Sequence, residues 1–369
     1  MEDLGYGIVG CGRVSTRHMD AIEHGPGMRL VAVADREFER ADGIAAGRKP
    51  KPTAYQDYHD LLTDPAVDVV VVCLPSQLHA EATVAAANAG KHIYCEKVMA
   101  STVNEARAMI RAADANGVKL MIGHSTRYHS AYMQARRLIE AGEIGEVIAV
   151  DGAFPTRADL PGSVRPTFWG IKAGARGHGV VMNFGCHYAD TARYLCGEEF
   201  AQVGAYITNR FSQGQAPEDQ FVVTAVCASQ AIVTIGQYGQ VDYVPSRNTG
   251  FTIYGSAGTL EAFYQPDAVA VKRAGDDTYT QVAFDEDIVA EGPWERLHRG
   301  LRQAIEDDTE PSVTGTDGLR NIEWALGAYL ANERREWMDL PLAEQYWDYA
   351  GPTREHSLPI ARGWEHGDA

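Results

Sequence analysis

The chain has 369 residues, a usual length for two domains, and its 45% hydrophobic and 22% charged residues are typical of a globular protein. Its 33 Lys and Arg residues stand against 50 Asp and Glu, a formal net charge of −17, which argues against nucleic acid and anionic membranes as partners. No apolar run reaches the roughly 20 residues of a membrane span and the start shows no signal peptide, so we expect a cytoplasmic protein.

The first third of the chain alternates short apolar segments with helical patterns. The apolar segments are rich in β-branched residues, as expected of strands buried on both faces, and cover residues 6–9, 30–34, 67–73, 92–95 and 120–122. The helical patterns between them cover residues 14–24, 37–47, 79–89 and 103–116. This alternation predicts an α/β fold, a doubly wound parallel sheet of the Rossmann type, over residues 1–124.

From residue 125 the pattern changes. After a helical stretch at 132–141, the apolar segments alternate with polar residues and cover 147–154, 202–210, 220–227, 231–238 and 252–254, with a hairpin turn at 255–258. Two helices follow, at 294–306 and from a cap at Thr316 to about Glu333. We therefore predict an α+β domain over 125–369 with a large, mostly antiparallel open sheet. The tail at 344–369 has no assigned structure.

The six cysteines form no C-x-x-C pair, and several lie in apolar segments. We expect small buried hydrophobic residues rather than a disulfide framework or a metal site.

A glycine-rich turn follows the first predicted strand and opens the first predicted helix. It reads Gly10-Cys11-Gly12-Arg13-Val14. Gly10 permits the tight turn, and Gly12 lets backbone N–H groups, from Gly12 through Val14, approach a pyrophosphate at the helix N-terminus. The third position of the motif is Ser15, which is small enough for close packing of the helix on the sheet. A glycine turn without a ligand is the alternative interpretation.

An acidic residue stands where a dinucleotide site needs one. Asp35 ends the next predicted strand, about twenty residues after the motif, where it can accept hydrogen bonds from ribose hydroxyls and repel a 2′-phosphate. This favours NAD over NADP. Arg36 leaves NADP possible, because a guanidinium beside Asp35 can receive a 2′-phosphate.

Further segments add to this turn. They are Leu-Pro-Ser-Gln-Leu-His at 74–79, Ala-Gly-Lys-His-Ile-Tyr-Cys-Glu-Lys at 89–97, Gly-Glu-Ile-Gly at 142–145, Gly-His-Gly at 177–179, 183–187 and Asp190. In this order the chain closely resembles the Gfo/Idh/MocA oxidoreductases, the glucose–fructose oxidoreductase and inositol dehydrogenase group, to about Leu342. The resemblance implies an NAD-dependent dehydrogenase for a secondary alcohol of a sugar, cyclitol or sugar derivative, assembled as a homodimer or homotetramer through the open face of the second sheet.

The Glu-Lys-Pro signature of that family appears here as Glu96-Lys97-Val98. By resemblance, Glu96 binds the nicotinamide ribose, while Lys97 lies beside the reacting oxygen and relays its proton. Val98 departs from the family, and its effect falls on the local backbone because proline fixes φ and valine does not.

The family pattern D-x-x-x-H appears as Asn183 to His187. Residues four apart lie on one helical face, where both side chains can reach one substrate carbon. Asn183 forms hydrogen bonds but cannot ionise. Either His187 is therefore the base with Lys97 as its main ionisable neighbour, or Lys97 carries the proton transfer alone.

The other expected site residues form two sets. On the cofactor side we expect Leu74, Pro75, Ser76, His79 and Trp169. On the substrate side we expect Arg127, Tyr128, Phe168 and His178. Simple packing is the alternative for the aromatic residues, and filling a loop is the alternative for His178.

Two rival functions remain open at this point. The first is a glycosidase or lyase that oxidises a sugar carbon transiently and then returns the hydride, with no net redox change. The second is a non-catalytic nucleotide sensor, against which the presence of both Lys97 and His187 argues.

Overall fold

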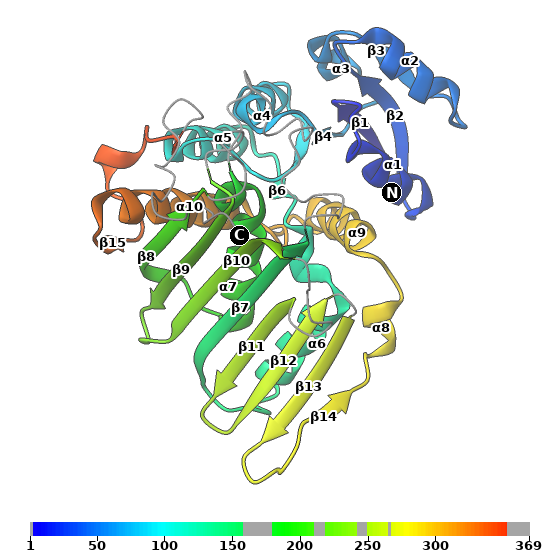
Figure 1. Cartoon of the computed structure of the whole chain (residues 1–369). Helices are drawn as coiled ribbons and strands as arrows, with labels where there is room; N and C mark the ends of the chain where they lie inside the picture. The colour runs from blue at the N-terminus through cyan, green and yellow to red at the C-terminus, as the bar shows by residue number, and fades with distance from the viewer. Residues whose placement is uncertain (1–2, 158–178, 210–217, 242–248, 265–266, 353–369) are drawn as a thin grey trace, which may run out of the picture. The chain divides into compact units, whose positions relative to one another are not determined.

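The computed structural model describes residues 3–157, 179–209, 218–241, 249–264 and 267–352 (Figure 1). It divides into two compact units, Met1–Ser125 with Glu291–Ile322, and Thr126–Ala290 with Glu323–Ala369. The return of residues 291–322 to the first unit was not part of the division expected at residue 124.

Six parallel strands form the sheet of the first unit, in the order β3-β2-β1-β4-β5-β6. The strands are β1 (Leu4–Val9), β2 (Met28–Ala34), β3 (Thr53–Tyr55), β4 (Val69–Val72), β5 (His92–Cys95) and β6 (Leu120–Ile122). The strand order reverses between β1 and β4, which confirms the Rossmann topology. β3 was not expected, because a strand of three residues hardly differs from a loop in the sequence.

The strands of this sheet are apolar because helices cover it. β4 is a run of four valines that are all buried. The helices of the unit are α1 (Ser15–His24), α2 (Phe38–Ala46), α3 (Tyr58–Thr63), α4 (His79–Asn88), α5 (Val103–Asn116) and α9 (Pro293–Glu306), with the 3₁₀ turn η1 (Ser76–Leu78). α5 shows how their ends are defined: the Thr102 hydroxyl accepts from Glu105 N, and Gly117 takes the left-handed conformation after the last turn.

Nine strands form the sheet of the second unit, in the order β14-β13-β12-β11-β7-β10-β9-β8-β15. The strands are β7 (Val147–Arg157), β8 (Phe200–Thr208), β9 (Gln220–Cys227), β10 (Ile232–Val241), β11 (Gly250–Gly255), β12 (Gly258–Tyr264), β13 (Asp267–Arg273), β14 (Thr280–Val282) and β15 (Met338–Asp339). Of the paired strands described, only β7 and β10 run parallel. The mostly antiparallel sheet is thus confirmed.

Helices cover one face of this second sheet. The helical elements of the unit are α6 (Ser130–Glu140), the π-helix η3 (Val181–Gly185), α7 (Cys186–Cys196), α8 (Glu286–Val289), the 3₁₀ turn η4 (Glu344–Tyr346) and the larger parts of the 3₁₀ turn η2 (Ser125–Tyr128) and of α10 (Gly315–Arg334). α6 packs against β12 and β13, and α7 against β7 and β10, so both lie behind the sheet in Figure 1. On this face Phe154 of β7 stacks on Tyr188 of α7, with ring centroids 3.5 Å apart.

The start of α10 differs from the expectation. The cap is Thr314 rather than Thr316: its hydroxyl accepts from Asp317 N at 3.1 Å, and the Asp317 carboxylate accepts from Thr314 N at 2.9 Å. This reciprocal pair is a capping box, so the prediction of Thr316 as the cap was wrong.

The six cysteines are all buried and free, as expected of small hydrophobic residues. No helix among the described residues is long and apolar enough to span a membrane.

Candidate functional site

The glycine turn after β1 has the conformation that its residues predict. Gly10 has φ of +94°, and a Cβ there would lie 2.7 Å from the carbonyl oxygen of Cys73, so the position requires glycine. A Cβ on Gly12 would meet nothing within 4 Å, which leaves open space above the turn. Ser15 is fully buried, and its hydroxyl donates to Gly12 O at 2.6 Å.

The N-terminus of α1 is prepared for an anion. Val14 precedes the helix and makes no side-chain capping bond, and no acidic residue lies in the first turn. Ser15 N and Arg17 N donate to the carbonyl oxygens of Gly12 and Val14, and no side-chain cap competes with a phosphate for this helix end. Arg13 is exposed and Val14 half-buried beside them. The turn therefore fits the pyrophosphate of a dinucleotide.

Asp35 follows β2 and is held firmly. One carboxylate oxygen accepts from Cys11 N and the other from Glu37 N, each at 3.0 Å. Arg40, from the first turn of α2, donates to both oxygens at 3.2 and 3.3 Å. Sequence reasoning missed Arg40, although its place one helical turn beyond Asp35 was a usable signal. Arg36 is exposed, and its carbonyl oxygen accepts from Gln56 Nε2 at 3.3 Å.

The Glu96-Lys97 pair directly follows β5. Glu96 is 7% exposed. Its Oε1 lies 3.0 Å from His18 Nε2, and its Oε2 accepts from Lys97 N at 3.2 Å. Lys97 is half-buried, the Lys97–Val98 peptide bond is cis, and Val98 is buried. Because parallel strands end at the same edge of a sheet, the pair lies at the edge that carries the glycine turn and Asp35.

His79 connects two parts of this edge. Its ring nitrogens lie 2.7 Å from Val98 O and 2.7 Å from Leu74 O, and the side chain is 1% exposed. Burial lowers the pKa of His79. The imidazole thus ties the loop after β4 to the residue after Lys97, while Leu74, Pro75 and Ser76 are half-buried. Contacts of these four residues with a cofactor stay predictions.

In the second unit, Asn183 and His187 stand four positions apart, where a π-helix leads into α7. Asn183 lies in η3 and His187 in the first turn of α7, and both are half-buried while Val181, Met182 and Tyr188 are buried. A π-helical turn is wider than an α-turn, so residues four apart stay on one side of it. Such turns are frequent at functional sites.

Arg127 is engaged with α7. Its guanidinium forms a bidentate pair with Asp190, with Nε donating to Oδ2 at 2.7 Å and Nη2 to Oδ1. Arg127 is 8% exposed and Asp190 fully buried. The pair holds α7 against η2, and a contact of Arg127 or of half-buried Tyr128 with substrate stays a prediction. Phe168, Trp169 and His178 lie outside the described residues.

Glu218 was not anticipated from the sequence. One carboxylate oxygen accepts from Tyr329 OH at 2.6 Å and from Val181 N at 3.1 Å, the latter at the start of η3. The side chain is fully buried, and burial raises its pKa to about 7. A Cβ on Gly179 would lie only 2.0 Å from the carboxylate, so the chain leading into η3 packs directly on it.

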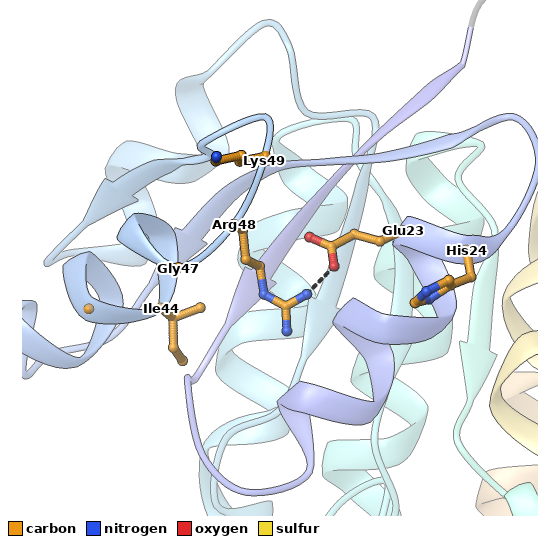
Figure 2. Close-up of a pocket in the computed structure, with 7 residues that line it drawn as sticks. Glu23, His24, Ile44, Gly47, Arg48 and Lys49 are labelled. Atoms are coloured by element: carbon orange, nitrogen blue, oxygen red, sulfur yellow. Dashed lines mark hydrogen bonds and ion pairs between the residues drawn. The ribbon is translucent and has the colours of Figure 1, made fainter.

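A hollow of about 440 Å³ lies elsewhere in the first unit (Figure 2). Glu23 and His24, from the last turn of α1, line it together with Arg48, which pairs with Glu23. The hollow is therefore at the opposite end of α1 from the glycine turn, and it is not the dinucleotide site. Within the ranges that the structure describes, no cluster of three metal-ligating side chains occurs.

A glycine turn that leads into a helix without a side-chain N-cap, at the point where the strand order of a Rossmann sheet reverses, defines a dinucleotide-binding protein. Residues 4–124 match the model of an oxidoreductase family with an NAD-binding Rossmann fold, and residues 132–261 match the GFO/IDH/MocA C-terminal domain. The chain therefore belongs to the Gfo/Idh/MocA family of oxidoreductases, and its cofactor is NAD, with NADP as the alternative.

Individual relatives agree with this assignment. The chain is 28% identical over 333 residues to 1,5-anhydro-D-fructose reductase of Ensifer adhaerens, covering 88% of this chain and 94% of the relative. It is 27% identical over 313 residues to inositol 2-dehydrogenase of Salmonella typhimurium, covering 82% and 88%. The structure of aldose-aldose oxidoreductase from Caulobacter crescentus, complexed with glycerol, superposes with a TM-score of 0.80 at 26% identity, covering 92% of this chain and 100% of that one.

We predict that Arg127→Met lowers the free energy of unfolding by roughly 3–5 kcal/mol, because it removes the guanidinium that neutralises the buried Asp190 carboxylate. The double variant Arg127→Met/Asp190→Leu should recover most of this loss. Chemical denaturation monitored by circular dichroism gives both values, with the exposed pair Arg299–Glu291 as a control worth less than about 1 kcal/mol. A loss below about 1 kcal/mol in Arg127→Met would contradict the prediction.

We predict that Glu218 makes stability depend on pH. Its pKa is raised from 4.5 in the unfolded chain to about 7 in the folded one, so its contribution is present below pH 4.5 and is lost as the pH rises through about 7. The free energy of unfolding of the wild type, minus that of Glu218→Gln, should fall by roughly 3 kcal/mol between pH 4.5 and 8. A difference independent of pH would show that Glu218 titrates normally.

Proposed function

We propose that this oxidoreductase transfers a hydride between NAD and a secondary alcohol or ketone of a sugar, a cyclitol or a sugar derivative. The observation that carries the proposal is that the Glu96-Lys97 pair lies at the same sheet edge as the glycine turn before α1. That edge is where open α/β sheets bind their ligands. The names of the relatives, which are reductases and dehydrogenases of sugars and inositol, support the substrate class.

When bound, NAD supplies the hydride acceptor or donor, and the chain has to manage the proton that leaves or joins the alcohol oxygen. Lys97 is suited to this because its ammonium group carries protons that it can donate to a substrate oxygen, and it is half-buried at the sheet edge where open α/β sheets bind ligands. His187 is the second proton-transfer group, since imidazole titrates near neutral pH. Asn183, on the same side of its helix, orients the substrate through hydrogen bonds without exchanging a proton.

We predict that Lys97→Ala lowers kcat/KM by about a hundredfold or more, the usual contribution of a positioned acid–base group. The assay follows the absorbance of reduced nicotinamide with NAD or NADP and a panel of sugars and cyclitols. Lys51→Ala is the matched control, because Lys51 is an exposed lysine paired with Asp42. His187→Ala, measured alongside, separates the two arrangements: if Lys97 acts alone, the His187 variant keeps most of the activity.

Unchanged turnover in Lys97→Ala would refute the proposed role of this lysine. A wild-type protein that cleaves glycosides without accumulating reduced nicotinamide would replace the dehydrogenase with a redox-neutral glycosidase or lyase. Binding of NAD without turnover of any substrate class would favour a nucleotide sensor.

We further propose that the open face of the second sheet joins copies of this chain into a homodimer or homotetramer. The register places five exposed apolar side chains on that face, which are Tyr206, Val222, Ile232, Tyr238 and Tyr254. No described helix crosses this face. A flat apolar surface of this extent is typical of an interface, and a second copy offers the same residues in a self-complementary pairing.

We predict that the wild type sediments as a dimer or tetramer and that the double variant Tyr206→Asp/Ile232→Asp sediments as a monomer. Two buried, unpaired charges on each side of the interface are costly enough to separate the copies. Val289→Asp is the control, since Val289 is 58% exposed on α8, outside this face. A monomeric wild type would refute this part of the proposal.

A further inference from the structure

A chain of buried hydrogen bonds runs from Glu96 into the interior of the first unit. Glu96 Oε1 lies 3.0 Å from His18 Nε2, and His18 Nδ1 lies 2.9 Å from His298 Nε2. Both histidines are fully buried, His18 on α1 and His298 on α9, two helices that pack together. Neither histidine belongs to the glycine turn or to the Glu96-Lys97 pair.

The order of donors in this chain follows from the carboxylate. An ionised Glu96 only accepts hydrogen bonds, so His18 must carry a proton on Nε2. In a neutral His18, Nδ1 then accepts, and His298 must donate from its own Nε2. Burial lowers the pKa of His298 well below its usual value, which keeps this ring neutral. Among the described residues, His298 Nδ1 has no hydrogen-bond partner, as expected if it carries only a lone pair.

Aromatic rings hold the two imidazoles in place. The Tyr94 ring stacks on His298, with centroids 4.8 Å apart, and meets His18 edge-on at 4.9 Å. Tyr6 meets His298 edge-on at 5.6 Å. These contacts restrict rotation of both rings and exclude water, so the direction of the hydrogen bonds persists.

The hydrogen bond from His18 also affects the charge of Glu96. Burial by itself raises the pKa of this carboxyl group, but its electrostatic neighbours, led by the hydrogen bond from His18 and including the positive charge of Lys97, outweigh it, and the pKa is lowered. The other titratable groups near Glu96 are the thiols of Cys73 and Cys95, and burial raises the pKa of both, so they remain neutral. His18 is thus the neighbour that most favours the ionised form of Glu96.

We propose that His18 and His298 are positioning residues for the cofactor: His18 holds Glu96 in place as an ionised acceptor for NAD, and His298 holds His18 in the required tautomer. This inference rests on the proposed use of Glu96 toward the nicotinamide ribose. A charged acceptor forms hydrogen bonds roughly twice as strong as a neutral one, so the state of Glu96 controls how tightly the cofactor binds.

The test measures the Kd for NADH by fluorescence titration between pH 6 and 9, without turnover. The wild type should bind with a nearly constant Kd. His18→Leu removes the donor, so Glu96 binds a proton more easily, and the Kd should rise about tenfold at pH 6 and recover as the pH increases. His18→Gln, which keeps an amide donor, should restore most of the affinity. His298→Leu should show a smaller change in the same direction.

A double-mutant cycle separates positioning from general damage. In a Glu96→Gln background, which has no carboxyl group to ionise, His18→Leu should change the Kd by less than about twofold and without pH dependence. His24→Leu, an exposed histidine at the end of the same helix, is the matched control. If His18→Leu does not fold, His298→Leu and its combination with Glu96→Gln provide the same cycle.

A pH-independent Kd in both His18→Leu and His298→Leu would overturn the inference, as would an equal loss with and without the Glu96 carboxyl group. Failure of the wild type and of His24→Leu to bind NADH at any pH would instead refute the assigned cofactor. The two failures are therefore distinguishable.

Discussion

Six parallel strands, buried on both faces, have to end at one edge of their sheet, and the first unit is organised around that constraint. Apolar side chains fill the strands, as in the four valines of β4, so polar groups first appear where the strands end. Asp35 and Glu96 stand at this edge with little exposure, and a carboxylate in such a place needs donors. Asp35 receives them from backbone N–H groups and Arg40, and Glu96 from Lys97 N and His18.

The second unit differs from the first, because helices cover only one face of its sheet and the other face is open. The helices on the covered face bring Asn183 and His187 to one side of η3 and α7. Buried polar groups hold these helices: the ion pair Arg127–Asp190 holds α7, and the Glu218 carboxyl group accepts from the first N–H of η3. A buried charge without its partner is costly, so such contacts favour one arrangement of the helix over its alternatives.

Much of the fold could be predicted because its signals are local. The strands β1, β2, β4, β5 and β6 stood out as short β-branched segments, and the alternating pattern after residue 125 indicated the antiparallel sheet. The sequence analysis did not predict the shortest elements: β3 has three residues, and its neighbour α3 has six. The cap of α10 was placed two residues late, because both Thr314 and Thr316 suit a cap and only the bonds to Asp317 distinguish them.

The sequence by itself determined the glycine turn, Asp35 and the Glu96-Lys97 pair, because strand, turn and helix follow one another within a few residues and their spacing sets the chemistry. Only the tertiary structure decided what holds those groups. His18 and His298 are 280 positions apart, and Glu218 meets Tyr329 across 111. Contacts of this kind depend on which distant segments pack together: the return of residues 291–322 to the first unit brings His298 to His18, and the return of residues 323–369 to the second unit brings Tyr329 to Glu218. The local spacing of residues does not predict that packing, because the packing follows from the burial of apolar surface over the whole unit.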